Sequence, residues 1–71
     1  MERETLFSIM KLYGINPVVR DEGTLHYCLE SNTSNHTQAW LISHKHPFMD
    51  GNKRAAFIIL VEEWLKVLED I

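Results

Sequence analysis

The chain has 71 residues and a formal net charge of -3, with seven Lys and Arg against ten Asp and Glu. This length allows a single domain, and the acidic balance argues against nucleic acid as a partner, because nucleic-acid binders usually present a basic face. No apolar run approaches the ~20 residues of a membrane span, so no membrane partner is expected. The single cysteine, Cys28, permits no internal disulfide and is typical of a reducing cytoplasm.

A first helix is predicted over residues 4–13. Its apolar residues have the i, i+3, i+4, i+7 spacing that places them on one face: Leu6, Ile9, Met10 and Tyr13. Gly14 follows as a C-terminal cap, and Pro17 favours an extended turn after it. We expect the apolar face to pack in the core.

Two shorter helices are predicted next. The second helix would begin at Asp21, whose carboxylate is a favourable N-cap, although Gly23 near its start costs about 1 kcal/mol. The third would begin with the capping pair Asn35 and Gln38 and run to about residue 45, because Pro47 then stops it. The inner face of the second helix would carry Leu25, Cys28 and Leu29, and the middle of the third would carry Ala39, Trp40, Ile42 and Ser43.

The fourth predicted helix, about residues 52–70, is the longest and the most apolar. Residues 55–61 are apolar on every side, and a broad apolar stripe continues beyond them. A helix that is hydrophobic all round belongs in the middle of a bundle. The sequence therefore predicts an all-α fold, a small bundle of about four helices around a central apolar helix.

The segment between the third and fourth helices carries most of the polar chemistry. Residues 46–54 read His-Pro-Phe-Met-Asp-Gly-Asn-Lys-Arg and lead directly into the fourth helix. A helix N-terminus offers free backbone N–H donors and a partial positive charge, which together attract anions. A base, a metal ligand and a phosphate clamp within nine residues are the components of a phosphoryl or nucleotidyl transfer site.

His46 is the candidate catalytic base, because histidine is the side chain whose unperturbed pKa suits proton transfer near neutral pH. Asp50 is the candidate Mg²⁺ ligand, since Mg²⁺ is usually held by a carboxylate together with substrate phosphates. A plain N-cap of the fourth helix is the alternative role for Asp50, and the two roles are compatible.

Four residues are the candidates for binding nucleotide phosphates. Gly51 would let the backbone approach phosphate closely, and Asn52 would form an anion hole with the neighbouring N–H groups. Arg54 would clamp a phosphate with its fixed two-pronged geometry, while Lys53 adds bulk and a point charge. The candidates are Gly51, Asn52, Lys53 and Arg54.

Residues 46–54 resemble the signature of the Fic/Doc (Fido) superfamily. The ending Asn-Lys-Arg resembles the death-on-curing (Doc) branch, which reads His-x-Phe-x-Asp-(Gly/Ala)-Asn-Lys-Arg, whereas the adenylylating Fic branch usually ends in Gly-Asn-Gly-Arg. Residues 19–25, Val-Arg-Asp-Glu-Gly-Thr-Leu, resemble the Arg-Asp-x-Gly-x-Leu element found upstream in Doc-like proteins. From the residues alone, Arg20 and Asp21 form a local ion pair or a cap, with a catalytic role as the less favoured interpretation.

The resemblance implies an all-helical Fido-like core and a Doc-like toxin of a toxin–antitoxin module. Such an enzyme would transfer the γ-phosphate of ATP, with Mg²⁺, to a hydroxyl of a target protein such as elongation factor Tu. It would be restrained in trans by an antitoxin. The segment between Leu29 and Gln38 is shorter than in Doc-like proteins, so residues 1–71 would be one shortened Fic/Doc domain. Two alternatives remain: adenylyl transfer of the Fic type, and a non-catalytic remnant.

Overall fold

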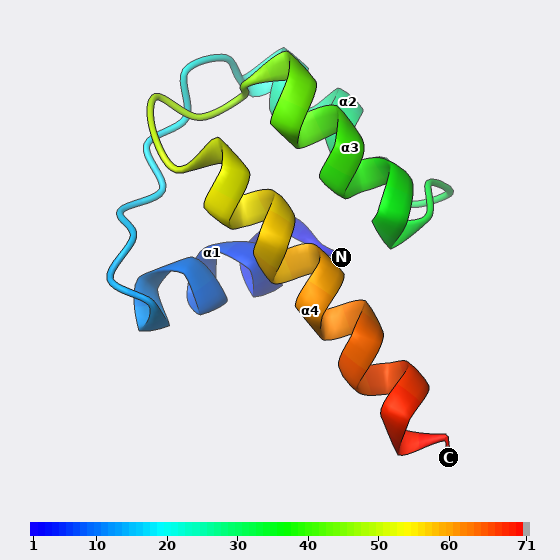
Figure 1. Ribbon diagram of the computed structural model, residues 1–71. Helices are drawn as coiled ribbons and strands as arrows, with labels where there is room; N and C mark the ends of the chain where they lie inside the picture. Colours follow the sequence, from blue (N-terminus) through cyan, green and yellow to red (C-terminus); the bar gives the residue numbers. More distant parts are fainter. Residues whose placement is uncertain (71) are drawn as a thin grey trace.

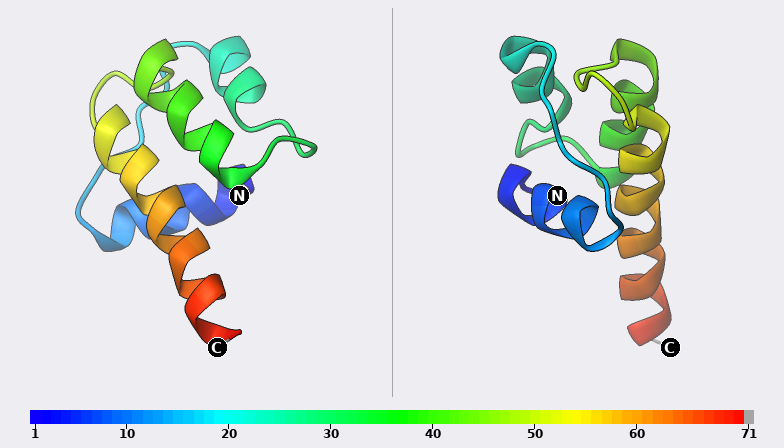
Figure 2. Two further views of the ribbon diagram at one scale, coloured as in Figure 1. Left: turned by 45° about the vertical axis from the view of Figure 1, so that its right-hand side comes forward. Right: turned by 90° about the vertical axis from the view of Figure 1, so that its left-hand side faces the viewer.

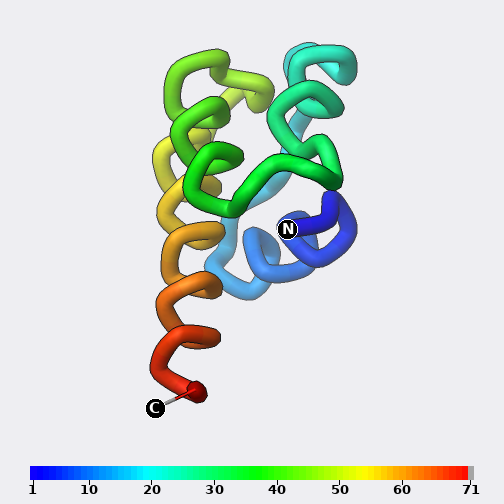
Figure 3. The backbone as a smooth tube through the Cα atoms, turned by 90° about the vertical axis from the view of Figure 1, so that its right-hand side faces the viewer, coloured from blue at the N-terminus to red at the C-terminus, as the bar shows by residue number. Residues whose placement is uncertain are grey.

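The structure is a computed structural model that describes residues 1–70, and it contains four α-helices. They are α1 (Arg3–Leu12), α2 (Glu22–Cys28), α3 (Asn35–Lys45) and α4 (Asn52–Glu69) (Figure 1). α3 and α4 pair side by side, and α1 and α2 form a second layer against one side of that pair (Figures 2 and 3). Residues 1–70 form no β-strand, only an isolated bridge between Val19 and Phe48. The predicted all-α bundle is confirmed.

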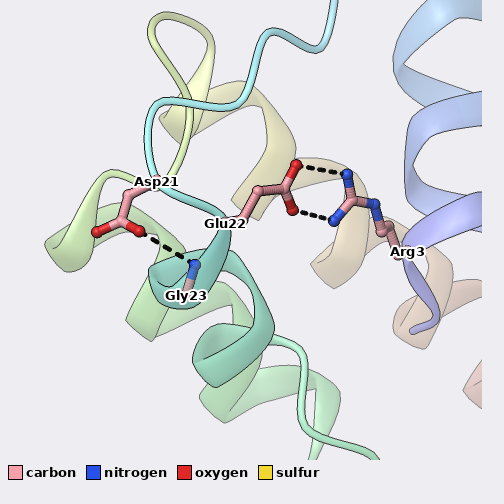
Figure 4. Close-up of polar contacts among 4 residues, drawn as sticks. All are labelled: Arg3, Asp21, Glu22 and Gly23. Atoms are coloured by element: carbon pink, nitrogen blue, oxygen red, sulfur yellow. Dashed lines mark hydrogen bonds and ion pairs between the residues drawn. The ribbon is translucent and has the colours of Figure 1, made fainter.

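The helix boundaries follow from local chemistry. α1 ends before Gly14, which has a φ of 76°, a conformation that glycine adopts without strain. Asp21 is the N-cap of α2, as predicted, and its Oδ1 accepts a hydrogen bond from the Gly23 N–H at 3.0 Å (Figure 4). A second hydrogen bond, from the Thr24 hydroxyl at 2.9 Å, is the main reason that the pKa of the Asp21 carboxyl lies below its usual value.

The predicted N-cap of α3 was wrong by one residue. Ser34 has extended backbone angles and its Oγ accepts a hydrogen bond from the Thr37 N–H at 3.2 Å, so Ser34 is the cap. Asn35 is already helical, and its side-chain oxygen accepts instead from the Met1 amine at 2.7 Å. Because Asn and Ser are both good caps, sequence alone does not choose between neighbours.

The core lies where the two layers meet. Cys28 is buried there as predicted, and desolvation raises the pKa of its thiol. The predicted burial of Tyr13 on the apolar face of α1 was wrong, because α1 ends before this residue and Tyr13 is 67% exposed. The largest fully buried apolar side chains are Phe48, Leu6, Met10, Leu25, Ile42 and Ile59.

α4 is enclosed over its first half only. It packs along α3 and crosses α1, and its buried residues are Ala55, Ala56, Ile58 and Ile59. The expected burial on every side is not met, because Phe57 faces outward and is 66% exposed. Beyond residue 61 the helix projects past the other three (Figure 1), and Trp64 and Leu68 are exposed. Among residues 1–70, none of the four helices combines the length and the hydropathy of a membrane span.

An ion pair joins the two helices of the second layer. Arg3 of α1 donates to Glu22 of α2 through both terminal guanidinium nitrogens, with Nη2 at 2.9 Å from Oε1 (Figure 4). This pairing lowers the pKa of the Glu22 carboxyl and raises that of Arg3. Both side chains are exposed, so the pair contributes little to stability.

Candidate functional site

Two segments far apart in the sequence meet at the site. The Arg20 N–H donates to the Pro47 carbonyl at 2.7 Å, and the Met49 N–H donates to the Val18 carbonyl at 2.9 Å, on either side of the Val19–Phe48 bridge. Residues 18–20 therefore run beside residues 47–49 as a short antiparallel pair. This contact brings together the two stretches that carry the family resemblance.

His46 lies at the C-terminal end of α3, where its backbone is held on both sides. Its N–H donates to the Ile42 carbonyl at 3.2 Å, and its own carbonyl accepts from Arg20 Nε at 2.8 Å. Its φ of 54° is left-handed, a conformation that costs a non-glycine residue about 1–2 kcal/mol. The backbone is thus constrained in an unfavourable conformation while the imidazole stays exposed at the mouth of the site.

Arg20 is a site residue whose role the sequence did not reveal. Its guanidinium donates to the His46 carbonyl and, through Nη2, to the Lys45 carbonyl at 3.0 Å. It therefore satisfies two carbonyls at the end of α3, where helical acceptors lack internal partners. The expected ion pair with Asp21 is not among the salt bridges of the described residues, and Asp21 serves as a cap. Only the fold shows which carbonyls Arg20 reaches.

Phe48 and Asn52 fix the loop before α4 to the rest of the fold. Phe48 is 1% exposed, and its ring centroid lies 5.8 Å from that of Phe7, so this side chain anchors the loop in the core. The Asn52 side chain makes two hydrogen bonds to the Phe48 backbone: Oδ1 accepts from the N–H at 2.9 Å, and Nδ2 donates to the carbonyl at 3.0 Å. The Asn52 side chain therefore holds the loop, which leaves its backbone N–H as the group available to an anion.

Gly51 is the N-cap of α4 and has a φ of 79°, so the alternative of Asp50 as a plain N-cap is wrong. The Asp50 carboxylate accepts instead from the Gly51 N–H at 2.8 Å. A Cβ on Gly51 would lie 3.0 Å from the Ile15 side chain. Gly51 is thus required for backbone conformation and for packing against Ile15, in addition to any approach to phosphate.

The first turn of α4 presents donors that the described part of the chain does not use. The N–H groups of Asn52, Lys53 and Arg54 precede the first intrahelical bond, which Ala55 makes to the Gly51 carbonyl at 2.8 Å. No side-chain cap covers them within residues 1–70. Two cationic side chains and the positive end of the helix dipole lie at the same place, an arrangement that favours an anion.

All the candidate site residues line one open hollow at the head of α4. Its volume is about 290 Å³. The structure brings together there the candidate base, the candidate metal ligand and the candidate phosphate-binding residues. Its lining is His46, Met49, Asp50, Gly51, Asn52, Lys53 and Arg54.

The hollow offers one carboxylate to a metal. No group of three or more His, Cys, Asp or Glu that could hold an ion occurs in the described chain. One carboxylate fits Mg²⁺ that arrives with a nucleotide, since Mg²⁺ is commonly bound by one or two carboxylates plus substrate phosphates and waters. Asp50 would hold such an ion, which would neutralise charge on the phosphates.

A larger apolar groove adjoins the hollow. It has a volume of about 680 Å³ and lies between the end of α1 and the outer face of α4. Lys53 and Arg54 line both the groove and the hollow. The other lining residues are Tyr13, Ile15, Phe57, Ile58 and Val61. The sequence did not predict this groove, because Tyr13 and Phe57 were expected in the core.

No protein-family model, no curated protein and no solved structure matches this chain. The resemblance to the Fic/Doc superfamily is therefore carried by residues 19–25 and 46–54 of the sequence alone.

Proposed function

We propose that the hollow binds the phosphates of Mg²⁺-ATP and that the protein transfers the γ-phosphate to a hydroxyl of a target protein, as a Doc-type toxin. One observation carries the proposal: His46, Asp50 and the N-terminus of α4 line the same hollow. A proton acceptor, a metal ligand and an anion seat are what phosphoryl transfer requires, because the chemistry depends mostly on positioning and charge stabilisation.

His46 accepts the proton of the attacking hydroxyl while the hydroxyl oxygen forms a bond to the γ-phosphorus. The bond between that phosphorus and the bridging oxygen breaks, and ADP leaves. The N–H groups of residues 52–54 and the charges of Lys53 and Arg54 stabilise the negative charge on the transferred group. Mg²⁺ held at Asp50 would supply further charge neutralisation.

The open mouth suits large protein partners. His46, Asp50, Lys53 and Arg54 are all exposed, so a segment of a target protein can reach the base without a lid opening. We propose a cytoplasmic target, with elongation factor Tu as the example that the resemblance suggests. We also propose an antitoxin that covers the mouth near Arg54, as the resemblance to the Doc branch suggests.

Adenylyl transfer is the second candidate. The lining of the open hollow does not determine which phosphate of ATP faces His46, because Lys53 and Arg54 offer two separate cationic contacts. The Lys at position 53, where adenylylating Fic enzymes have Gly, favours γ-phosphate transfer. The long, charged Lys53 side chain leaves less room for the triphosphate to contact the backbone there.

Labelling of a bacterial lysate with ATP carrying ³²P at the α or the γ position tests the proposal. We expect label in protein from γ-³²P-ATP only, reduced about 10²–10⁴-fold by His46→Ala. His36→Ala is the matched control, because His36 is an exposed histidine near the other end of α3 and does not line the hollow. Label from the α position would identify adenylyl transfer, and no label from either would contradict a transferase.

A further inference from the structure

The apolar groove beside the hollow has the form of a small-molecule site. Its volume of about 680 Å³ lies within the range of about 300–1,000 Å³ that is usual for ligand pockets. Its floor is formed by the buried aliphatic residues Ile15 and Ile58. Its rims are the aromatic rings of Tyr13 and Phe57, which are 67% and 66% exposed.

The groove and the hollow adjoin each other and share two lining residues, and the two spaces together are called the path here. Phe57 and Ile58 each follow a cation of the hollow by four residues, Lys53 and Arg54 respectively, so they lie one turn further along the same face of α4. Both cations line both spaces. A ligand that occupies the whole path therefore meets apolar and aromatic surface at one end and positive charge with free N–H donors at the other.

We propose that this groove holds the base of the bound nucleotide, stacked against Phe57 and Tyr13, while the phosphates occupy the hollow. The proposal rests on the proposed function. Charge complementarity selects the occupant: a ligand with an anionic chain and a flat apolar body matches the two cations and the two aromatic rims. A nucleoside triphosphate has this form, and base–aromatic stacking is a common mode of nucleotide binding.

The same lining sets nucleotide specificity. The described residues along the groove are apolar apart from the Tyr13 hydroxyl and the two cations at its end. Base edges are distinguished by polar groups placed to hydrogen-bond them, whereas every base has a face that can stack. The site therefore binds ATP and GTP with affinities within about threefold of each other.

Calorimetric titration of the full chain with Mg²⁺-ATP, Mg²⁺-GTP and Mg²⁺-tripolyphosphate tests the groove separately from the hollow. We expect Phe57→Ala to weaken ATP and GTP about tenfold and to leave tripolyphosphate within about twofold. Phe57→Trp should restore the nucleotide affinity. Trp64→Ala is the matched control, since Trp64 is an aromatic residue of α4, 65% exposed and outside the groove.

Intermolecular NOEs between base protons and the rings of Phe57 and Tyr13 give a direct readout. Unchanged ATP affinity in Phe57→Ala, with tripolyphosphate still bound, would overturn the groove proposal and leave the phosphate site intact. Failure of the wild type to bind either ATP or tripolyphosphate would overturn both proposals. A concentration-dependent dimer that Phe57→Ala dissociates, at unchanged nucleotide affinity, would show that a second copy occupies the groove.

Discussion

The two ends of α4 have similar apolar content and opposite surroundings. At its head, the preceding loop is held by hydrogen bonds from three separate segments: Val18 and Arg20 before α2, Ile42 of α3 and Asn52 of α4 itself. At its tail, beyond residue 61, the helix projects from the fold with Trp64, Leu65 and Leu68 exposed. The candidate site is therefore held in place by hydrogen bonds to its tertiary neighbours. The apolar character of the helix does not by itself determine burial.

Among the site residues, the largest effect is expected at Asn52, which holds the loop before α4. Asn52→Ala leaves the N–H and the carbonyl of the buried Phe48 without their side-chain partners. Each unsatisfied buried group costs about 1–3 kcal/mol, so unfolding by urea should show a loss of about 3 kcal/mol. Asn32→Ala, in an exposed turn, is the control and should change stability by less than about 0.5 kcal/mol. Equal stability of the two variants would mean that Asn52 does not hold the loop.

The next effect concerns the support of His46. Arg20→Ala removes the charged donors from the carbonyls of His46 and Lys45, and hydrogen bonds from charged groups contribute about 1.5–3 kcal/mol when well formed. Because Arg20 is exposed, we expect a loss near the low end, about 1.5 kcal/mol, together with reduced transfer. Arg3→Ala breaks a surface ion pair and a cation–π contact with the Phe7 ring, whose centroid lies 4.9 Å from the guanidinium. Each contributes at most about 1 kcal/mol, and transfer should be reduced less than by Arg20→Ala. A larger loss for Arg3→Ala than for Arg20→Ala would contradict the role assigned to Arg20.

The left-handed backbone of His46 predicts a separation of stability from activity. Gly relieves the strain at a φ of 54° and Ala does not, so His46→Gly should be more stable than His46→Ala by about 1 kcal/mol. Both variants should lose transfer, because both lack the imidazole. Thermal melts and the ³²P assay check the two halves of the prediction. A stable and active His46→Gly variant would show that the His46 imidazole takes no part in transfer.

Low pH should reduce the stability of the layer formed by α1 and α2. Hydrogen bonds from Thr24 lower the pKa of Asp21, and those from Arg3 lower the pKa of Glu22. A carboxyl with a lowered folded pKa contributes stability above its unfolded pKa, here 3.8 and 4.5, and loses that contribution as the pH falls through the folded value. The melting temperature should therefore decrease when the pH is lowered below about 4.5. Asp21→Asn should reduce that dependence, because the amide keeps a capping oxygen and does not titrate.

The smallest effect is expected at the tail. Trp64→Ala removes a large side chain, yet its exposed position predicts a change within about 0.5 kcal/mol. Ile59→Ala, five residues closer to the head and fully buried, should cost about 2–5 kcal/mol. Hydrogen exchange should show the same contrast, with amides of residues 56–60 protected more than those of residues 64–69. Similar protection along the whole helix would show that the tail is covered in solution.

Much of the fold could be predicted because its signals are local. Asp21, Gly14 and Pro47 mark helix ends by their own backbone chemistry, and the spacing of Leu6 and Met10 identifies the buried side of α1. The predicted helix limits accordingly agree with the observed ones to within about one residue. The N-cap of α3 was missed because two adjacent residues carry equally suitable side chains, and only backbone angles distinguish them.

The sequence by itself determined the number and order of the helices and the polar composition of residues 46–54, since periodicity, capping and loop chemistry act between near neighbours. Only the tertiary structure decided which of these residues share a hollow and that Arg20 holds the end of α3. The packing of α1 against α4 also left Tyr13 and Phe57 outside the core, on the rims of a groove. The physical reason is that burial and long-range hydrogen bonds depend on which surfaces meet, and helical spacing does not specify the partner.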